Sequence, residues 1–294
     1  MRNERSFMET DVLKTLKYFS FFDYSPRFEE IFVFLNRKTT IKNLKKTLNS
    51  LIRLKRLSIK DNRYTLGEYI DKEKWREDRV VITRHKLQKA IRFLTLVSMF
   101  SQIKLVGLSG STAMANAKKE DDIDFFVITA QNRLWTGRLI ALMIASLFGR
   151  RKFNDTHTSD KLCLNLFFDE KNLKIGAKKR SYYVAHEVLQ MKPLINKGKT
   201  YERFLEANKW VFKIFPNSRL MFSNASLKNA SNHKSTFFEH LHNNVILNSF
   251  QDLTEKILKK LQLFLINRHK TTELISDTQL WFFPDDFERK LQNR

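Results

Sequence analysis

The chain has 294 residues, of which 42% are hydrophobic, with only 7 glycines and 4 prolines. This composition excludes a disordered chain and predicts two or three compact units joined by short linkers. One cysteine, Cys163, excludes a framework of internal disulfide bonds, and the first residues lack the apolar core of a secretory signal. The longest apolar runs, Leu134–Phe148 and Phe93–Phe100, fall short of the roughly 18 residues that span a bilayer. We therefore expect a cytoplasmic protein without a membrane partner.

Lysine and arginine outnumber the acidic residues by 54 to 31, which gives a formal net charge of +23. Such a field favours polyanionic partners such as nucleic acids, nucleotides or an anionic membrane surface. The competing explanation is compositional, because abundant Lys, Asn, Ile and Phe are also expected of an AT-rich genome. The position of the charge along the chain has to decide between them.

Residues 11–66 predict three helices followed by a hairpin. Asp11 is a candidate cap for the first helix, Ser25 and Pro26 begin the second, and Thr40 caps the third. The turn residues Asp61 and Asn62 separate two short alternating strands. This order resembles a winged helix-turn-helix domain, which we place at residues 1–70.

The third helix of this module has a basic face opposite its leucines. Ten Lys or Arg residues occur from Arg37 to Arg63, against Asp61 alone. In winged helices the third helix enters the major groove and the hairpin contacts the backbone. Four residues of this face are candidates for binding nucleic acid: Lys42, Lys45, Lys46 and Arg53. The alternatives are an ordinary solvated helix face and a surface that docks protein.

A connecting helix is expected over residues 71–102, and residues 103–108 read as a buried strand. The strand runs into Gly110 and Ser111, where a glycine lets the backbone approach a phosphate and the following amides can bind it. A second strand opens with Asp122 and Asp124, two positions apart. Both carboxylates should therefore point to one face, about 6.6 Å apart along the chain.

Two converging carboxylates suit Mg²⁺ or Mn²⁺, hard cations that also bind the phosphates of a nucleoside triphosphate. Phosphoryl transfer needs little more than positioning and charge neutralisation, and Lys118 and Lys119 could add positive charge near a triphosphate. Two solvated aspartates on a loop are the simpler alternative. That alternative explains neither the glycine after the first strand nor the apolar run that follows Asp124.

The run Gly110-Ser111, ten residues and then Asp122-Ile123-Asp124 is similar to the signature of the DNA polymerase beta-like nucleotidyltransferase superfamily. The resemblance implies a small mixed sheet with packed helices, which we place at residues 103–178. It also implies Mg²⁺-dependent transfer of a nucleoside monophosphate from an NTP to an acceptor, with release of pyrophosphate.

The family usually has a third carboxylate on a later strand, and here the chain departs from the pattern. The central outward position of the candidate strand 162–168 is Asn165, whose amide can bind a metal but cannot accept a proton. Asp160 and Asp169, at the two ends of this strand, are possible substitutes.

Residues 179–294 read as a helical region, which completes an α+β multidomain fold. Within it, His186 and Glu187 suggest a metal or acid–base pair, but without a second histidine at ligand spacing a surface or packing role fits better. The expected function is a nucleotidyltransferase acting on a nucleic acid or a protein. A nucleic-acid-binding regulator that senses nucleotides without turnover is the alternative that Asn165 favours. A transferase that modifies small cationic antibiotics is disfavoured by the +23 charge.

Overall fold

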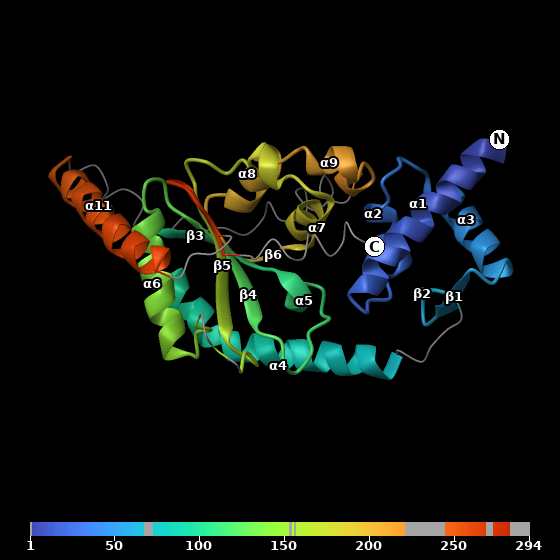
Figure 1. Ribbon diagram of the computed structural model, residues 1–294, viewed down its shortest axis with the longest axis horizontal. Helices are drawn as coiled ribbons and strands as arrows, with labels where there is room; N and C mark the ends of the chain where they lie inside the picture. Colours follow the sequence, from blue (N-terminus) through green and yellow to red (C-terminus); the bar gives the residue numbers. More distant parts are fainter. Residues whose placement is uncertain are drawn as a thin grey trace. The chain divides into compact units, whose positions relative to one another are not determined.

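The computed structural model describes residues 2–67, 73–152, 155, 157–220, 245–268 and 273–282 (Figure 1). Within these residues the chain forms two compact units. The first unit contains the residues up to Asp78, the segment Ser181–Leu189 and the described residues from Lys209 to 220. The second contains Arg79–Arg180, Gln190–Asn208 and the described residues after 244. Neither unit is continuous along the chain.

The first unit begins with three helices and a hairpin, the predicted order of elements. They are α1 (Arg2–Phe21), α2 (Phe28–Val33), α3 (Ile41–Arg53), β1 (Leu57–Lys60) and β2 (Arg63–Leu66). The hairpin turns at Asp61 and Asn62, whose positive φ angles of 46° and 60° fit a two-residue turn. Apolar residues of α1, α2, α3 and β1 share one core.

Two predicted helix starts in this unit differ from the structure. Asp11 does not cap α1 but lies inside it, because residues 2–10 contain no glycine or proline that would stop the helix. The α2 helix begins two residues after Pro26, with Arg27 at the cap and the Glu30 carboxylate accepting from the Arg27 backbone N–H at 2.7 Å. The predicted cap of α3 is confirmed, since Thr40 Oγ1 accepts a hydrogen bond from the Asn43 N–H at 3.2 Å.

The α3 helix separates its charges from its leucines as the sequence pattern predicts. Leu44, Leu48 and Leu51 are fully buried in the core. All four candidate nucleic-acid-binding residues are exposed: Lys42, Lys45, Lys46 and Arg53. This face of α3 is therefore an exposed basic surface.

His186 belongs to the core of the first unit. It lies on α7 (Tyr182–Gln190) and is stacked between the rings of Tyr18, at a centroid distance of 3.7 Å, and Phe34, at 4.5 Å. Complete burial lowers the pKa of His186 well below its ordinary value, so the neutral imidazole packs as an aromatic ring. Of the surface and packing roles that the sequence left open, the structure shows packing.

The second unit is built on a six-stranded sheet in the order β6-β3-β4-β5-β8-β7. Its strands are β3 (Ile103–Leu108), β4 (Ile123–Thr129), β5 (Leu162–Asp169), β6 (Lys192–Asn196), β7 (Leu274–Ile275) and β8 (Gln279–Trp281). The β4–β5 pair is parallel and the other neighbours are antiparallel. The predicted mixed sheet is therefore present.

The two faces of this sheet have different neighbours, and β4 shows which side chains point to each. Phe125 and Val127 share a core with α4 (Glu73–Ser98) and α6 (Leu134–Leu147). Phe126 points the other way, toward Phe204 on α8 (Thr200–Ala207). Because side chains alternate along a strand, Asp124 shares the face of Phe126. The predicted carboxylate pair therefore lies opposite α4.

The region from 179 onward is not helical throughout, which corrects the prediction. Strand β6 lies at one edge of the sheet, and β7 and β8 form the opposite edge next to β5. Such strands of two to five residues are too short to show a period in the sequence. The helical reading does hold for α11 (Val245–Asn267). The Glu255 carboxylate of this helix accepts from the backbone N–H groups of Trp135 and Thr136 at the start of α6.

The polar stretch 223–234 and the acidic residues after Phe282 lie outside the described residues. None of the described helices is both long enough and apolar enough to cross a bilayer.

Candidate metal centre

The turn between β3 and the short helix α5 (Gly110–Ala113) places backbone directly against a carboxylate. Gly110 has a φ of +60°, which favours glycine. A Cβ atom at this position would lie 2.7 Å from Asp124 Oδ2, closer than real contacts allow. The preceding Ser109 N–H donates to the Asp124 carbonyl at 3.0 Å, which joins the turn to β4. The turn therefore needs glycine both for its backbone angle and for the space that Asp124 occupies.

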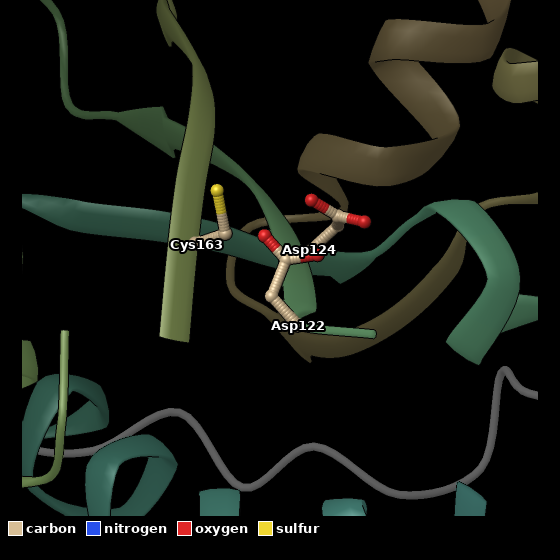
Figure 2. Close-up of side chains that lie close together, drawn as sticks. All are labelled: Asp122, Asp124 and Cys163. Carbon is tan, nitrogen blue, oxygen red and sulfur yellow. The ribbon is translucent and has the colours of Figure 1, made fainter. Parts of the chain in front are cut away.

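The two predicted carboxylates come together. Asp124 is the second residue of β4 and Asp122 immediately precedes the strand. With Cys163 on the neighbouring strand β5, each offers a ligand atom, and these atoms all lie within 4.8 Å of one another (Figure 2). The Asp122 side chain is 13% exposed, so the group is sheltered but reachable from solvent. We call Asp122, Asp124 and Cys163 the acidic cluster.

Asn165 reaches this cluster through an irregularity in the sheet. Phe125 pairs with Leu164 and Phe126 with Leu166, so Asn165 is the extra residue of a β-bulge. Bulges re-aim side chains and are common beside functional sites. Asn165 Nδ2 donates a hydrogen bond to Asp124 Oδ1, and Asn165 Oδ1 accepts one from the Cys163 thiol at 2.7 Å. The third position of the expected site is therefore an amide that is hydrogen-bonded to both Asp124 and Cys163.

Neither acidic substitute takes the place of a third carboxylate. Asp160 accepts from Lys86 and Lys89, at 2.8 Å and 2.6 Å. Burial alone would raise the pKa of Asp160, but the hydrogen bonds and charges of the two lysines together lower it. Asp169 ends β5 and is paired with Thr129, six residues along the strand from Cys163, or roughly 20 Å. Among the described residues, the carboxylates of the cluster are those of Asp122 and Asp124.

The loop that connects α5 to β4 is held by Asp121, whose role the sequence did not reveal. Its Oδ2 accepts from Ser111 Oγ at 2.7 Å and from the Lys118 backbone N–H at 2.9 Å. The Ser111 hydroxyl thus binds the loop, while the side chains of Lys118 and Lys119 are exposed. Of the predicted nucleotide-binding residues, the structure brings Gly110 against the cluster and Ser111 against the loop beside it.

Cys163 is a further residue whose place at this site the sequence did not reveal. Burial, reinforced by the charges of Asp124 and Asp122, raises the pKa of Cys163 well above its ordinary value, so the group is a neutral thiol. The signal that could have found it is its position on β5, two residues before Asn165 and on the same side of the strand.

No family model, curated protein or solved structure matches this chain. What the site can do therefore follows from its own side chains. Two carboxylates and an amide oxygen are hard donors that suit Mg²⁺ or Mn²⁺, while a thiol is a softer donor. The donor set fits a divalent cation, with Asp122 and Asp124 as its charged ligands.

Arg151 supplies a positive charge to the cluster from within the chain. Its guanidinium Nη1 donates to Asp122 Oδ2 at 2.5 Å and lies 3.9 Å from Cys163 Sγ. The Arg151 side chain is 41% exposed, so this ion pair is partly screened by solvent. A divalent ion at Asp122 has to share this carboxylate with Arg151 or displace it.

We expect Arg151→Gln to raise the affinity for Mn²⁺ by about two- to fivefold, because a partly exposed ion pair of this kind contributes up to about 1 kcal/mol. The bound fraction can be measured from the electron paramagnetic resonance signal of free Mn²⁺. Lys152→Gln is the matched control. Lys152 is exposed, and its substitution removes the same charge from the position next to Arg151. An equal rise in both variants would mean that only the net charge matters.

Proposed function

We propose that this protein is a divalent-metal-dependent nucleotidyltransferase that transfers a nucleoside monophosphate from an NTP to an acceptor. The observation that carries the proposal is the convergence of Asp122 and Asp124 beside a glycine turn that leaves no room for a side chain. Two acidic side chains on solvated loops would not require this packing. The resemblance to the DNA polymerase beta-like superfamily supports the same reading.

Each residue at the site has its own role in this proposal. Asp122 and Asp124 hold the cation, and Asn165 orients Asp124 by donating to its Oδ1. When held there, Mg²⁺ or Mn²⁺ would supply neutralisation of the triphosphate charge and activation of the attacking oxygen. The backbone at Gly110 can approach a phosphate without a side chain in between. Lys118 and Lys119, both exposed, place two ammonium groups on the loop before the carboxylates.

A second candidate is a regulator that binds nucleotides without turning them over. The position of Asn165 favours it, because an amide in contact with Asp124 cannot remove a proton from an acceptor hydroxyl. Asp160 and Asp169 are both engaged elsewhere, so neither supplies the missing base. The two candidates share a metal and nucleotide site and differ in catalysis.

Turnover separates these candidates. Purified protein is incubated with each NTP labelled at the α-phosphate, with Mg²⁺ or Mn²⁺, and with RNA, DNA or cell extract as acceptor. The enzyme should label an acceptor and release pyrophosphate, and Asp124→Asn should do neither. Nucleotide binding by equilibrium dialysis without any turnover would support the regulator, and loss of both binding and turnover would contradict both proposals.

For the first unit, we propose a winged-helix module whose exposed α3 face binds nucleic acid, and a nucleic acid is then a candidate acceptor. The triple variant Lys45→Ala, Lys46→Ala, Arg53→Ala should flatten the slope of log K against log salt by about 2 to 3, since each phosphate contact contributes about 0.9. Fluorescence anisotropy with labelled duplex DNA and RNA measures this slope. The control removes three exposed lysines of the unit outside the Arg37–Arg63 cluster, namely Lys17, Lys209 and Lys213. Equal slopes in the two triple variants would indicate a solvated or protein-docking face instead.

A further inference from the structure

The buried face of α4 changes character along the helix. Its buried residues recur at intervals of three and four, which defines one stripe. From Ala90 through Phe93 to Val97 the stripe is apolar and joins the core beneath the sheet. Before Ala90 the same stripe consists of polar residues that are nearly as well buried: Arg79 at 8%, Thr83 at 4% and Lys86 at 1% exposure. Burial of polar groups is costly unless they are hydrogen-bonded, so their partners identify what this part of α4 does.

These partners lie in the segments that lead to the acidic cluster. Arg79 Nη1 donates to Asn116 Oδ1 at 2.8 Å, and Thr83 Oγ1 accepts from the Ala117 N–H at 3.3 Å. Both partners belong to the loop between α5 and β4. The polar stripe of α4 therefore holds the loop that carries Asp121 and Asp122.

Lys86 makes the most concentrated set of contacts in this stripe. Its ammonium donates to the Asp121 carbonyl at 2.6 Å, to the Lys119 carbonyl at 3.0 Å and to Asp160 Oδ1 at 2.8 Å. An ammonium has three protons, and here each has an acceptor. Asp121 immediately precedes Asp122, and Asp160 lies three residues before Cys163. The buried Lys86 side chain thus binds the segment that precedes β4 and the segment that precedes β5.

The segments that precede β4 and β5 are also hydrogen-bonded directly to each other. The Asp160 N–H donates to the Asp121 carbonyl at 3.1 Å, and the Ile123 N–H donates to the Lys161 carbonyl at 2.8 Å. The Asp121 carbonyl therefore accepts from both Lys86 and Asp160. Loss of the ammonium would remove one donor from each of its three acceptors, although each keeps another: Ser159 Oγ for the Lys119 carbonyl, the Asp160 N–H for the Asp121 carbonyl and Lys89 for the Asp160 carboxylate. The buried ammonium is the group that binds all three acceptors at once, so its loss should loosen the contact between the two segments.

We propose that Lys86 is a positioning residue that sets the spacing of Asp122 and Asp124 relative to Cys163 and Asn165, and thereby the affinity of the cluster for a divalent cation. The inference rests on the proposed function, because it assumes that the cluster binds metal. Lys86 acts through backbone and loop contacts and does not touch the metal-binding atoms. The positive charge of Lys86 would by itself weaken cation binding, whereas its hydrogen bonds strengthen cation binding by holding the carboxylates in place.

These two effects have opposite signs, which makes the proposal testable. If Lys86 acted only through its charge, Lys86→Met would tighten Mn²⁺ binding by removing a positive group. If it only supported the fold, Lys86→Met would lower the melting temperature and leave the affinity for Mn²⁺ unchanged. If it positions the carboxylates, affinity should fall by about 10- to 100-fold, as expected when supporting contacts around metal ligands are lost.

The matched control is Lys89→Met. Lys89 donates to the other oxygen of the same carboxylate, Asp160 Oδ2, at 2.6 Å, and its side chain is 46% exposed. The substitution removes the same charge and a bond to the same residue, but the carbonyls of Lys119 and Asp121 keep their donor. We expect Lys89→Met to bind Mn²⁺ within about twofold of the wild type, since an exposed ion pair contributes little.

The experiment titrates the full chain with Mn²⁺ alone, below the melting temperature of every variant, and follows free Mn²⁺ by electron paramagnetic resonance. Amide hydrogen exchange at Ile123 and Asp160 is a second readout that needs no metal. Both amides should exchange faster in Lys86→Met than in Lys89→Met. Should Lys86→Met not fold, Lys86→Arg takes its place, because a planar guanidinium keeps the charge but cannot direct three protons at acceptors that converge on one nitrogen.

The outcomes separate the two proposals. A wild type that binds no Mn²⁺ contradicts the proposed function, while faster exchange in Lys86→Met would still show that Lys86 holds the two segments together. Unchanged exchange, or Mn²⁺ affinity equal to or above that of the wild type in the Lys86 variants, overturns the positioning role even if the wild type binds Mn²⁺ and turns over NTPs.

Discussion

Asp124→Asn is expected to weaken Mn²⁺ binding by more than about 100-fold, because losing a charged ligand should cost more than losing the contacts that support one. The substitution is well suited to this question. Asn retains an Oδ1 atom that can accept the hydrogen bond from Asn165 Nδ2, so the contact between β4 and β5 can persist. The main change is the loss of one negative charge from the cluster. Asp122→Asn should behave in the same way and should in addition release Arg151 from its ion pair.

The control for this prediction is Glu120→Gln. Glu120 is exposed on the loop that precedes the cluster, and its carboxylate is not one of the grouped ligands. The variant removes the same charge two residues from Asp122, so it reports what the general field of the loop contributes. We expect its Mn²⁺ affinity to stay within about twofold of the wild type, as is usual for surface charges. If Glu120→Gln and Asp124→Asn lose affinity equally, the cation is held by the field of the loop and not by the cluster.

The turn and the carboxylate pair could be predicted because their signals are local. Gly110 follows a buried strand, and the spacing of Asp122 and Asp124 places them on one face of the next strand. The charges of α3 could be assigned for the same reason, since Leu44 and Leu48 show its helical period within one short segment.

The rest of the site depends on pairings between distant segments, which a local period does not contain. The contact between Asn165 and Asp124 needs the parallel pairing of β4 with β5 and a bulge whose position only the register reveals. Sequence reasoning found Asn165 because it occupies the middle of an apolar strand. The bond of Arg151 to Asp122 could not be predicted, because Arg151 lies in an irregular segment before β5.

The polar half of the α4 stripe was missed for a different reason. Arg79, Thr83 and Lys86 continue the period of Ala90 and Phe93, so the buried face could have been traced through them. A buried lysine is rare unless it is paired, however, and its partner Asp160 is 74 residues away. A polar residue that continues an apolar stripe therefore indicates a buried hydrogen-bond partner elsewhere in the chain, although the stripe cannot say where.

Part of the net charge of +23 lies beside the candidate metal site. Three cations lie close to the acidic groups: Lys86 and Lys89 at Asp160, and Arg151 at Asp122. Of these, Arg151 contacts the cluster itself, so its removal and the removal of Lys86 should change metal affinity in opposite directions. If only charge mattered, removal of Arg151 and removal of Lys86 would both raise the affinity for the metal. Opposite effects would therefore have to come from the different contacts of the two side chains.

Gly110→Ala should abolish the close approach of the turn to Asp124 and weaken Mn²⁺ binding by more than about tenfold, because the new Cβ would lie 2.7 Å from Asp124 Oδ2 and the carboxylate would have to move. The substitution has a second effect, since a left-handed backbone conformation with a side chain costs about 1–2 kcal/mol. A fall in stability alone would therefore not show that the space beside Asp124 matters.

Gly198→Ala separates the two effects. Gly198 has a φ of +58°, close to the +60° of Gly110, but a Cβ built there meets no atom within 4 Å. Both variants should lose about 1–2 kcal/mol of unfolding free energy in urea titrations, because both force alanine into the same backbone region. Only Gly110→Ala should also lose Mn²⁺ affinity, because only there does the added methyl group displace a ligand. Equal affinities in the two variants would mean that the turn and the carboxylate are independent, and the geometric basis for a phosphate and metal site at this position would be lost.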